Sequence, residues 1–294
     1  MRSCSLWIAL VAAASLLAGC ATAPPPVVHG TVAPGFEEVR AEVAKNLRDR
    51  GEKGCAVSVY LRGQKVVDLW AGERDDAGAP WEEHTLVPIY STTKGVAALV
   101  LAIAHARGWL DYDAKVADYW PEFATAGKGD VTVRQLLSHQ AGLVLLDQEI
   151  GYDTVRALDA LAPILARQAP AWTPGTRHGY HLSTLGFYMN ELFRRVEPRH
   201  RSIGRFLAEE IAPALDLELF LGAPEAIGPS RVARVETTSP IGGLAHMTDP
   251  PFAVLTRLLS PWSTMTRTFA IPTGYDVNDP RWWRVEIPSG NGVA

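Results

Sequence analysis

The alternation of apolar and polar residues predicts a helix and a β-hairpin near the start of the chain. Apolar side chains recur every three or four positions over residues 36–51, and Gly51 follows as a helix stop. Two strand-like runs, 55–61 and 65–71, flank a short turn that contains Gly63. A helix that leads into a hairpin predicts an antiparallel sheet with a helix on one face.

From residue 91 onward the pattern becomes helical. The segment 92–107 is apolar nearly all round, which predicts a buried central helix that ends before Gly108. Thr132 and Gln135 have the spacing of a capping box and predict a further helix start. Other helices are predicted over residues 154–167, 183–195, 203–212 (with Ser202 as N-cap) and 252–259.

The N-terminus has the form of an export signal. The apolar run 6–17 has signal-peptide length and is too short to span a bilayer as a stable helix. It ends in Leu-Ala-Gly-Cys at 17–20, which resembles the lipobox of bacterial lipoproteins. The resemblance implies a signal peptide over residues 1–20, lipidation of Cys20 and a membrane anchor on the periplasmic side, with the outer membrane favoured. A plain secretory signal is the alternative. Residues 21–35 are then predicted as a tether.

Composition and charge add two limits. Hydrophobic residues make up 47% and charged residues 20% of the 294-residue chain, which is typical of a globular domain. The formal net charge of −4 gives no basic footprint for a nucleic acid, so we predict no such partner. Of three cysteines, Cys4 lies in the signal and Cys20 would carry lipid, which leaves Cys55 without an internal disulfide partner.

Ser91 and Lys94 stand three residues apart at the start of the predicted apolar helix. Side chains at this spacing share one helix face, so Lys94 can reach the Ser91 hydroxyl. Burial would lower the pKa of Lys94 and make its neutral amine a base for the serine. The helix N-terminus also favours negative charge on an attacking serine oxygen. The same tetrapeptide is compatible with an N-capping serine beside a lysine that reaches the surface.

Three stretches together resemble one superfamily, which comprises serine β-lactamases, penicillin-binding proteins and family VIII carboxylesterases, with the esterases most similar. They are STTK (91–94), VRQLLSHQAGL (133–143) and PGTRHGYH (174–181). The resemblance implies an α/β part plus an all-α part: an antiparallel sheet flanked by helices, with a helical subdomain.

The same resemblance implies a hydrolase domain over residues 36–294, with its helical part at about 85–215. It assigns Ser91 as the nucleophile, Lys94 as the general base and Tyr180 as a proton relay. It implies no metal and no organic cofactor. An ester or a β-lactam-like small molecule would be the substrate.

The chain departs from the superfamily pattern in two places. Leu182 stands where β-lactamases carry an asparagine that holds the substrate's amide, which argues for simple esters. The third motif of the superfamily, on a late sheet strand, is not found, and residues 242–246 are a poor candidate for it. The comparison implies that the C-terminal sheet strands are missing, and with them one oxyanion-hole donor. Loss of one such donor typically lowers turnover by ~10²–10³.

Three functions remain open at this point. The first is hydrolysis of small carboxylic esters through an acyl-enzyme, and the second is β-lactamase or D-alanyl carboxypeptidase activity. The third is a non-catalytic cell-envelope lipoprotein with a degenerate cleft, which the missing motif favours and the intact Ser91, Lys94 and Tyr180 oppose. His139 is interpreted as a structural hydrogen-bonding residue. His178 and His181 lack a third ligand nearby, so no metal site is predicted.

Overall fold

The computed structural model describes residues 25–236, 256–257, 260, 263–269 and 272–294. The chain divides into two compact units, one up to Glu83 and one from His84 onward. The predicted signal peptide with Cys20 lies outside the described residues, as does most of the helix predicted over 252–259. No helix in the described ranges has the length and apolar character that a membrane crossing requires.

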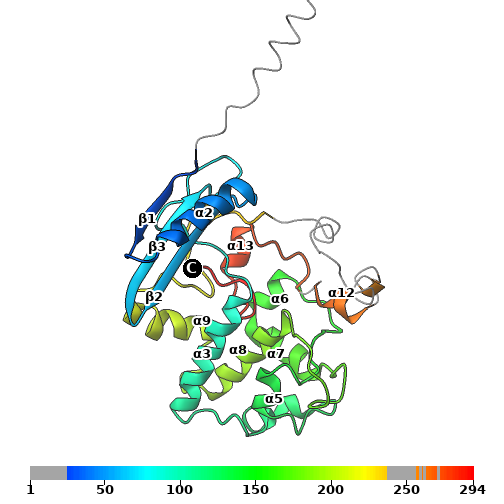
Figure 1. Ribbon diagram of the computed structural model, residues 1–294. Coiled ribbons are helices and arrows are strands. Elements are labelled where there is room, and N and C mark those ends of the chain that lie inside the picture. The colour runs from blue at the N-terminus through cyan, green and yellow to red at the C-terminus, as the bar shows by residue number, and fades with distance from the viewer. Residues whose placement is uncertain (1–24, 237–255, 258–259, 261–262, 270–271) are drawn as a thin grey trace, which may run out of the picture. The chain divides into compact units, whose positions relative to one another are not determined.

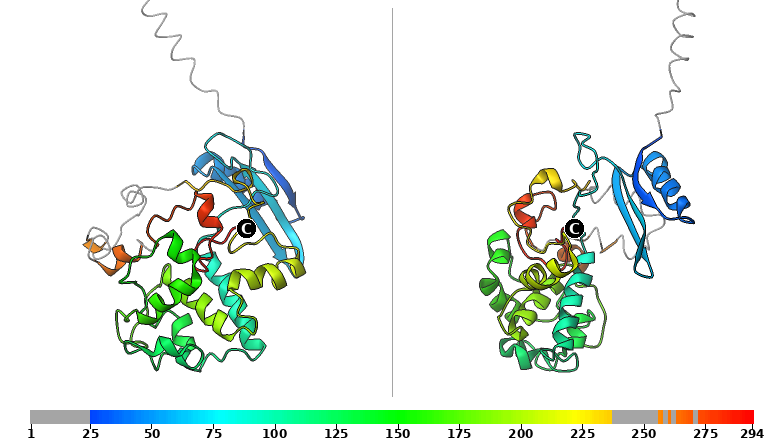
Figure 2. Two further views of the ribbon diagram at one scale, coloured as in Figure 1. Left: turned by 180° about the vertical axis from the view of Figure 1, so that it is seen from behind. Right: turned by 90° about the vertical axis from the view of Figure 1, so that its left-hand side faces the viewer.

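The first unit is a three-stranded antiparallel sheet with one helix packed on it (Figures 1 and 2). Its strands are β1 (Val28–Val32), β2 (Gly54–Leu61) and β3 (Gln64–Gly72), in the spatial order β1-β3-β2, and its helix is α2 (Glu37–Asp49). The predicted helix and hairpin are therefore confirmed. The prediction of a tether over 21–35 is wrong for β1. This short strand gains its backbone hydrogen bonds from β3, which lies far along the chain, so its own pattern gives a weak signal.

Local chemistry explains both the turn and the core of this unit. Arg62 and Gly63 both have positive φ angles, 51° and 79°, as a two-residue hairpin turn that matches the strand twist requires. Along β3, Val67, Leu69 and Ala71 alternate onto the same face and are buried together with Val43 of α2. The unit thus has a small core of its own between helix and sheet.

The second unit is mostly helical (Figure 1). Its α-helices are α3 (Thr92–Ala106), α4 (Val116–Tyr119), α5 (Val133–Leu137), α6 (Tyr152–Arg156), α7 (Leu158–Arg167), α8 (Thr184–Val196), α9 (Ile203–Phe206), α12 (Thr264–Thr268) and α13 (Pro280–Trp283). Short 3₁₀ turns η1 (Pro121–Ala124), η3 (Pro213–Leu215) and η4 (Pro229–Arg231) and a π turn η2 (Leu207–Ile211) complete it.

Two predicted helices differ from the structure in continuity. The helix predicted over 154–167 is two helices, α6 and α7, because Ala157 between them leaves the helical region with a ψ of 83°. The helix predicted over 203–212 changes from α-helical to π geometry after Phe206. The predicted caps are confirmed: the hydroxyls of Thr132 and Ser202 accept the backbone N–H three residues on.

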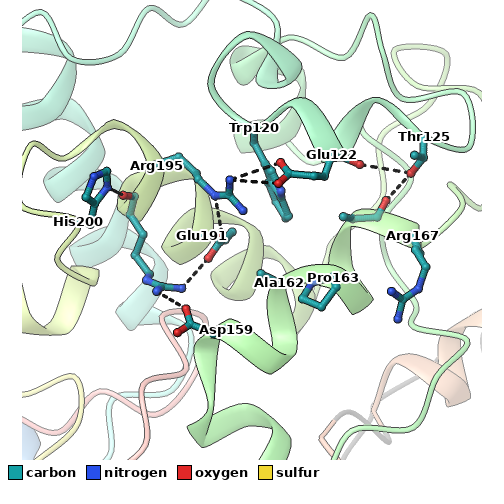
Figure 3. A pocket seen from close by; sticks show the side chains of 12 residues that line it. Trp120, Glu122, Thr125, Asp159, Ala162, Pro163, Arg167, Glu191, Arg195 and His200 are labelled. Atoms are coloured by element: carbon teal, nitrogen blue, oxygen red, sulfur yellow. Dashed lines mark hydrogen bonds and ion pairs between the residues drawn. The ribbon is translucent and has the colours of Figure 1, made fainter.

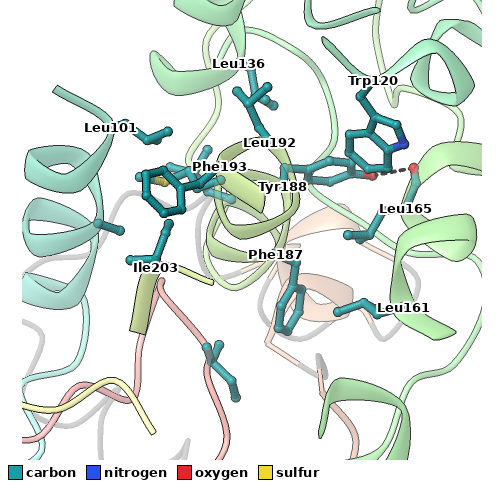
Figure 4. Close-up of a cluster of buried hydrophobic side chains, with 14 of the residues drawn as sticks. Leu101, Trp120, Leu136, Leu161, Leu165, Phe187, Tyr188, Leu192, Phe193 and Ile203 are labelled. Carbon is teal, nitrogen blue, oxygen red and sulfur yellow. Dashed lines mark hydrogen bonds between the residues drawn. The ribbon is translucent and has the colours of Figure 1, made fainter. Parts of the chain in front are cut away.

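The central buried helix of this unit is α8 rather than α3 (Figure 4). Every residue from 184 to 193 is buried, including Asn190 and Glu191. These polar groups are paired, since Asn190 accepts the N–H of Ile203 at 2.8 Å. By contrast, α3 buries one side only, and Leu99 on its other side is 52% exposed. The apolar composition of α3 therefore predicted its inner face correctly and its outer face wrongly.

The last residues of the chain run beside the segment that leads into α3. The Ile89 N–H donates to the Gly292 carbonyl at 2.8 Å, and the Val87 N–H donates to the Ala294 carbonyl at 2.8 Å. The Gly292 N–H in turn donates to the Thr93 hydroxyl inside α3. Residues 287–294 are thus fixed against the N-terminus of this helix.

Candidate active site

Ser91 is the N-cap residue of α3, where the backbone enters the helix. Its hydroxyl makes no capping bond to the helix backbone. The structure therefore does not support the interpretation of Ser91 as an N-capping serine. The oxygen lies instead at the helix N-terminus, where the aligned peptide dipoles stabilise negative charge.

Tyr90, directly before Ser91, has a strained backbone. Its φ of 44° lies in the left-handed region, which a bulky side chain rarely adopts. The Thr93 N–H donates to the Tyr90 carbonyl at 3.0 Å, so this conformation is fixed by the first turn of α3. Such strain costs about 1–3 kcal/mol and is often found where a neighbouring side chain must be aimed at a substrate.

Lys94 is buried, with 9% of its surface exposed, and its amine has three oxygen neighbours. The Nζ atom lies 3.2 Å from the Ser91 hydroxyl oxygen. It lies 2.6 Å from the Leu182 carbonyl oxygen and 2.7 Å from the Ser289 carbonyl oxygen. The alternative in which Lys94 reaches the surface is therefore excluded, because its three oxygen neighbours hold the amine inside the protein.

The surroundings of Lys94 make it easier for its amine to lose a proton and so to act as a base for Ser91. Burial lowers the pKa of Lys94, and the interaction with Tyr180 opposes this in part. A neutral amine has two N–H groups and one lone pair. When Lys94 is neutral, the two carbonyls can take its two N–H groups, and its lone pair can then face the Ser91 hydroxyl. The geometry is therefore that of a base beside its nucleophile.

Tyr180 completes the group. Its ring centre lies 4.7 Å from the Lys94 Nζ atom, and its side chain is 47% exposed. Burial alone would raise the pKa of Tyr180, but hydrogen bonding with Ser91 and Lys94, together with the lysine charge, lowers it overall. The three side chains predicted from the sequence are thus brought together within one unit of the structure.

The loop that carries Tyr180 is held by two histidines. The Leu143 N–H donates to Nε2 of His181 at 2.9 Å, so that nitrogen is unprotonated and Nδ1–H donates to the Gly179 carbonyl. The His181 N–H in turn donates to Nδ1 of His139 at 3.0 Å. Burial lowers the pKa of each of these two imidazoles to about 4, so both are neutral at pH 7. His139 therefore links the second and third matched stretches.

Two partners of Lys94 were missed by sequence reasoning. Leu182 was singled out for its side chain, but its backbone carbonyl makes the contact. Ser289 was not predicted at all; it is fixed because its hydroxyl donates to the Ser183 carbonyl at 2.5 Å. A Cβ at Gly186 would collide with the backbone of Pro288 and Ser289, so this close approach requires glycine. Backbone carbonyls carry no residue-type signal, which is why the pattern did not show them.

Ser91 opens into a pocket of about 270 Å³ in the second unit. The residues that line it beside Ser91 are mostly apolar or aromatic: Tyr90, Leu182, Phe269, Pro272, Tyr275 and Ile287. Such a lining suits a small apolar group next to the serine. In the described part of the chain, no three His, Cys, Asp or Glu side chains come together as ligands for a metal ion.

Comparison with known proteins identifies the family. Residues 39–293 match the protein family described as Beta-lactamase. The curated protein "Esterase/beta-lactamase LipL" of Mycobacterium tuberculosis is 35% identical over 274 residues, which are 91% of this chain and 61% of that protein. A "Beta-lactamase" of Escherichia coli is 25% identical over 178 residues, 59% of this chain and 44% of that protein. The chain thus spans less than two thirds of the length of these relatives.

Solved structures of related proteins have the same fold as this chain. A family VIII carboxylesterase superposes with a TM-score of 0.74 at 36% identity, over 91% of this chain and 68% of that chain. A penicillin-binding protein homologue from Caulobacter crescentus superposes with a TM-score of 0.75 at 38% identity, over the same shares. The predicted β-lactamase and transpeptidase-like fold is therefore confirmed. With the family match extending over most of its length, the chain belongs to the β-lactamase family.

Proposed function

We propose that the protein is a serine hydrolase that cleaves small carboxylic esters through an acyl-enzyme. The observation that carries the proposal is the set of contacts around Lys94: its buried amine lies 3.2 Å from the Ser91 hydroxyl oxygen and donates to the carbonyls of Leu182 and Ser289. A serine hydroxyl needs such a base to be a nucleophile near neutral pH.

In the first half of the reaction, Lys94 takes the proton of Ser91 while the serine oxygen bonds to the ester carbonyl carbon. The resulting oxyanion is stabilised at the N-terminus of α3, where the Ser91 N–H is a donor. Tyr180 then passes the proton to the departing alkoxide, which leaves as an alcohol. In the second half, Lys94 and Tyr180 take a proton from the water that attacks the acyl-enzyme, the bond to the Ser91 oxygen breaks, and the same proton returns to Ser91 as the carboxylic acid leaves.

Simple esters fit the pocket better than β-lactams for one reason. Leu182 offers no side-chain amide to hold the amide of a β-lactam or peptide substrate, and its carbonyl is already bonded to Lys94. The apolar and aromatic lining next to Ser91 instead suits a short acyl chain. Homologues named as an esterase/β-lactamase keep β-lactam hydrolysis as the second candidate.

The test compares substrates on the chain without its first twenty residues. We expect turnover of p-nitrophenyl acetate and butyrate, slow or no cleavage of a chromogenic cephalosporin, and no turnover of either by Ser91→Ala. Faster cleavage of the cephalosporin than of both esters would contradict the preference. A folded chain that cleaves neither would support the non-catalytic alternative.

Export and lipid anchoring through Cys20 form the second part of the proposal. Its support is the motif at residues 17–20, which lies outside the described residues. In a bacterial host grown with an alkyne-tagged fatty acid, we expect the tag on the full chain and not on Cys20→Ala. Tagging of both chains, or of neither, would contradict the anchor.

A further inference from the structure

A second and larger hollow lies away from Ser91. It has a volume of about 770 Å³ and shares no lining residue with the pocket at Ser91. Its walls come from α7, from the end of α8 and from residues 120–125 (Figure 3). Its volume is in the range of sites that take small organic ligands, which is about 300–1,000 Å³. Nothing in the proposed hydrolysis uses this pocket.

On the α8 side of the pocket, positive charge is already neutralised. Arg194 donates to Glu191 at 2.8 Å and to Asp159 at 2.6 Å. Arg195 donates to Glu191 at 2.7 Å and lies 3.3 Å from Glu122 (Figure 3). Each guanidinium thus has two carboxylate partners, so this wall has no net attraction for an anion.

At the end of α7 the charges are different. Arg167 lines the pocket, and no carboxylate of the described residues pairs with it. Nearby, Lys128 is wholly buried and its ammonium donates to the carbonyls of Thr125, Ala166 and Gln168 at 2.9, 2.9 and 2.6 Å. Thr125 and Ala166 both line the pocket, so Lys128 fixes this end of it. Arg167 is therefore the cation of this end that lines the pocket without a carboxylate partner among the described residues, and Lys128 holds the backbone on either side of it.

Between these two sides the lining is apolar. Trp120, Ala162, Pro163 and Ala166 contribute to it; Pro163 is exposed, and the other three are buried and offer little accessible surface. A ligand in the pocket would therefore contact the hydrocarbon of Pro163 and the guanidinium of Arg167.

We propose that this pocket binds an organic monocarboxylate with an apolar body, whose carboxylate pairs with Arg167 and whose body lies on Pro163. Because Arg194 and Arg195 are already paired with carboxylates, Arg167 is left as the partner for a single negative charge, which disfavours phosphates and dicarboxylates. The site is independent of the chemistry at Ser91, so it stands even if no ester is cleaved.

The test uses fluorine NMR on the full-length chain with 4-(4-fluorophenyl)butanoate as the probe. The matched neutral ligand is 4-(4-fluorophenyl)butan-1-ol, which has the same body without the charge. Arg167→Gln removes the proposed partner. Arg156→Gln is its control, since Arg156 is also exposed near a helix end, but does not line the pocket. A second sample has Ser91 blocked by a fluorophosphonate or replaced by alanine, so that binding at the serine pocket is recognised.

We expect the butanoate to bind the parent chain, Arg156→Gln and the Ser91-blocked chain alike. Arg167→Gln should bind it about tenfold more weakly, as the loss of one charge-assisted hydrogen bond implies. The parent chain should bind the neutral alcohol about as weakly as Arg167→Gln binds the butanoate. Absence of binding at millimolar butanoate, equal binding by Arg167→Gln, or loss of binding on blocking Ser91 would each overturn the proposal.

Discussion

Two buried lysines of the second unit differ in what surrounds their amines. Lys94 has two carbonyl oxygens and the hydroxyl of Ser91 within 3.2 Å. Lys128 has three carbonyl oxygens within 2.9 Å and is more deeply buried. Burial lowers the pKa of both, for Lys128 to about 8.

The difference shows that a low lysine pKa does not by itself make a base. A carbonyl only accepts, so three carbonyls engage all the N–H groups of an ammonium and leave Lys128 nothing to deprotonate. The hydroxyl beside Lys94 has a proton to give and opens into a pocket. Lys94 is therefore suited to catalysis, whereas Lys128 joins two segments of backbone.

Replacement of each lysine by methionine is the strongest way to break this comparison. Lys94→Met should lower kcat/KM for p-nitrophenyl butyrate by ~10³, because the general base is lost. Lys128→Met should leave kcat/KM of the folded enzyme within a factor of about three and lower the free energy of unfolding in urea by about 2 kcal/mol. Similar losses of kcat/KM in both variants would contradict the assignment.

Tyr180→Phe sharpens the assignment of the proton path. The ring is kept and only the hydroxyl is removed, so the fold should not change. Because transfer to the leaving group is impaired, kcat should fall by ~10² while the circular dichroism spectrum is unchanged. A leaving group of lower pKa should reduce the defect, and an equal defect for all leaving groups would argue against a proton relay.

Gly186→Ala tests whether the carbonyl of Ser289 aligns Lys94. The added methyl group would displace the backbone at Ser289, and with it one of the two carbonyls that orient the amine. We expect kcat/KM to fall by about tenfold or more. Gly151→Ala is the control, since a Cβ there meets nothing within 4 Å. Full activity of the Gly186 variant with unchanged stability would contradict this role.

The pH dependence of stability tests the surroundings of Lys128. The folded pKa of Lys128, about 8, lies below the ordinary lysine pKa of 10.5, so the unfolded chain binds more protons between these values. Stability should therefore rise with pH in this window, by no more than about 3 kcal/mol from this group. The free energy of unfolding in urea should be measured for the parent chain and for Lys128→Met, and the difference between the two should rise with pH in this window. A difference that is flat from pH 8 to 10 would contradict a lowered pKa.

Much of the fold could be predicted from periodicity, because helices such as α2 and α8 have apolar residues at helical spacing over more than three turns. The errors have physical causes. The strand β1 depends on a distant partner, and the break at Ala157 leaves the pattern of apolar residues unchanged. The exposed side of α3 has the same apolar composition as its buried side, so composition could not separate them.

Of the site, the side-chain chemistry was predictable and the backbone chemistry was not. Ser91, Lys94 and Tyr180 have the residue types that acyl transfer requires, and the structure brings them together. The left-handed Tyr90 and the Ser289 carbonyl depend on local backbone conformation and on contacts between segments distant in sequence. Neither the left-handed backbone of Tyr90 nor the position of the Ser289 carbonyl can be predicted from the type of a single residue.

The central claim, that Lys94 activates Ser91, is tested most directly by intact-mass measurement after exposure to a fluorophosphonate. The account predicts one adduct per chain on the parent protein, none on Ser91→Ala, and labelling of Lys94→Met slowed by at least about a hundredfold. Lys128→Met should be labelled at the parent rate. An adduct on folded Ser91→Ala, or labelling of Lys94→Met as fast as that of the parent, would contradict the account.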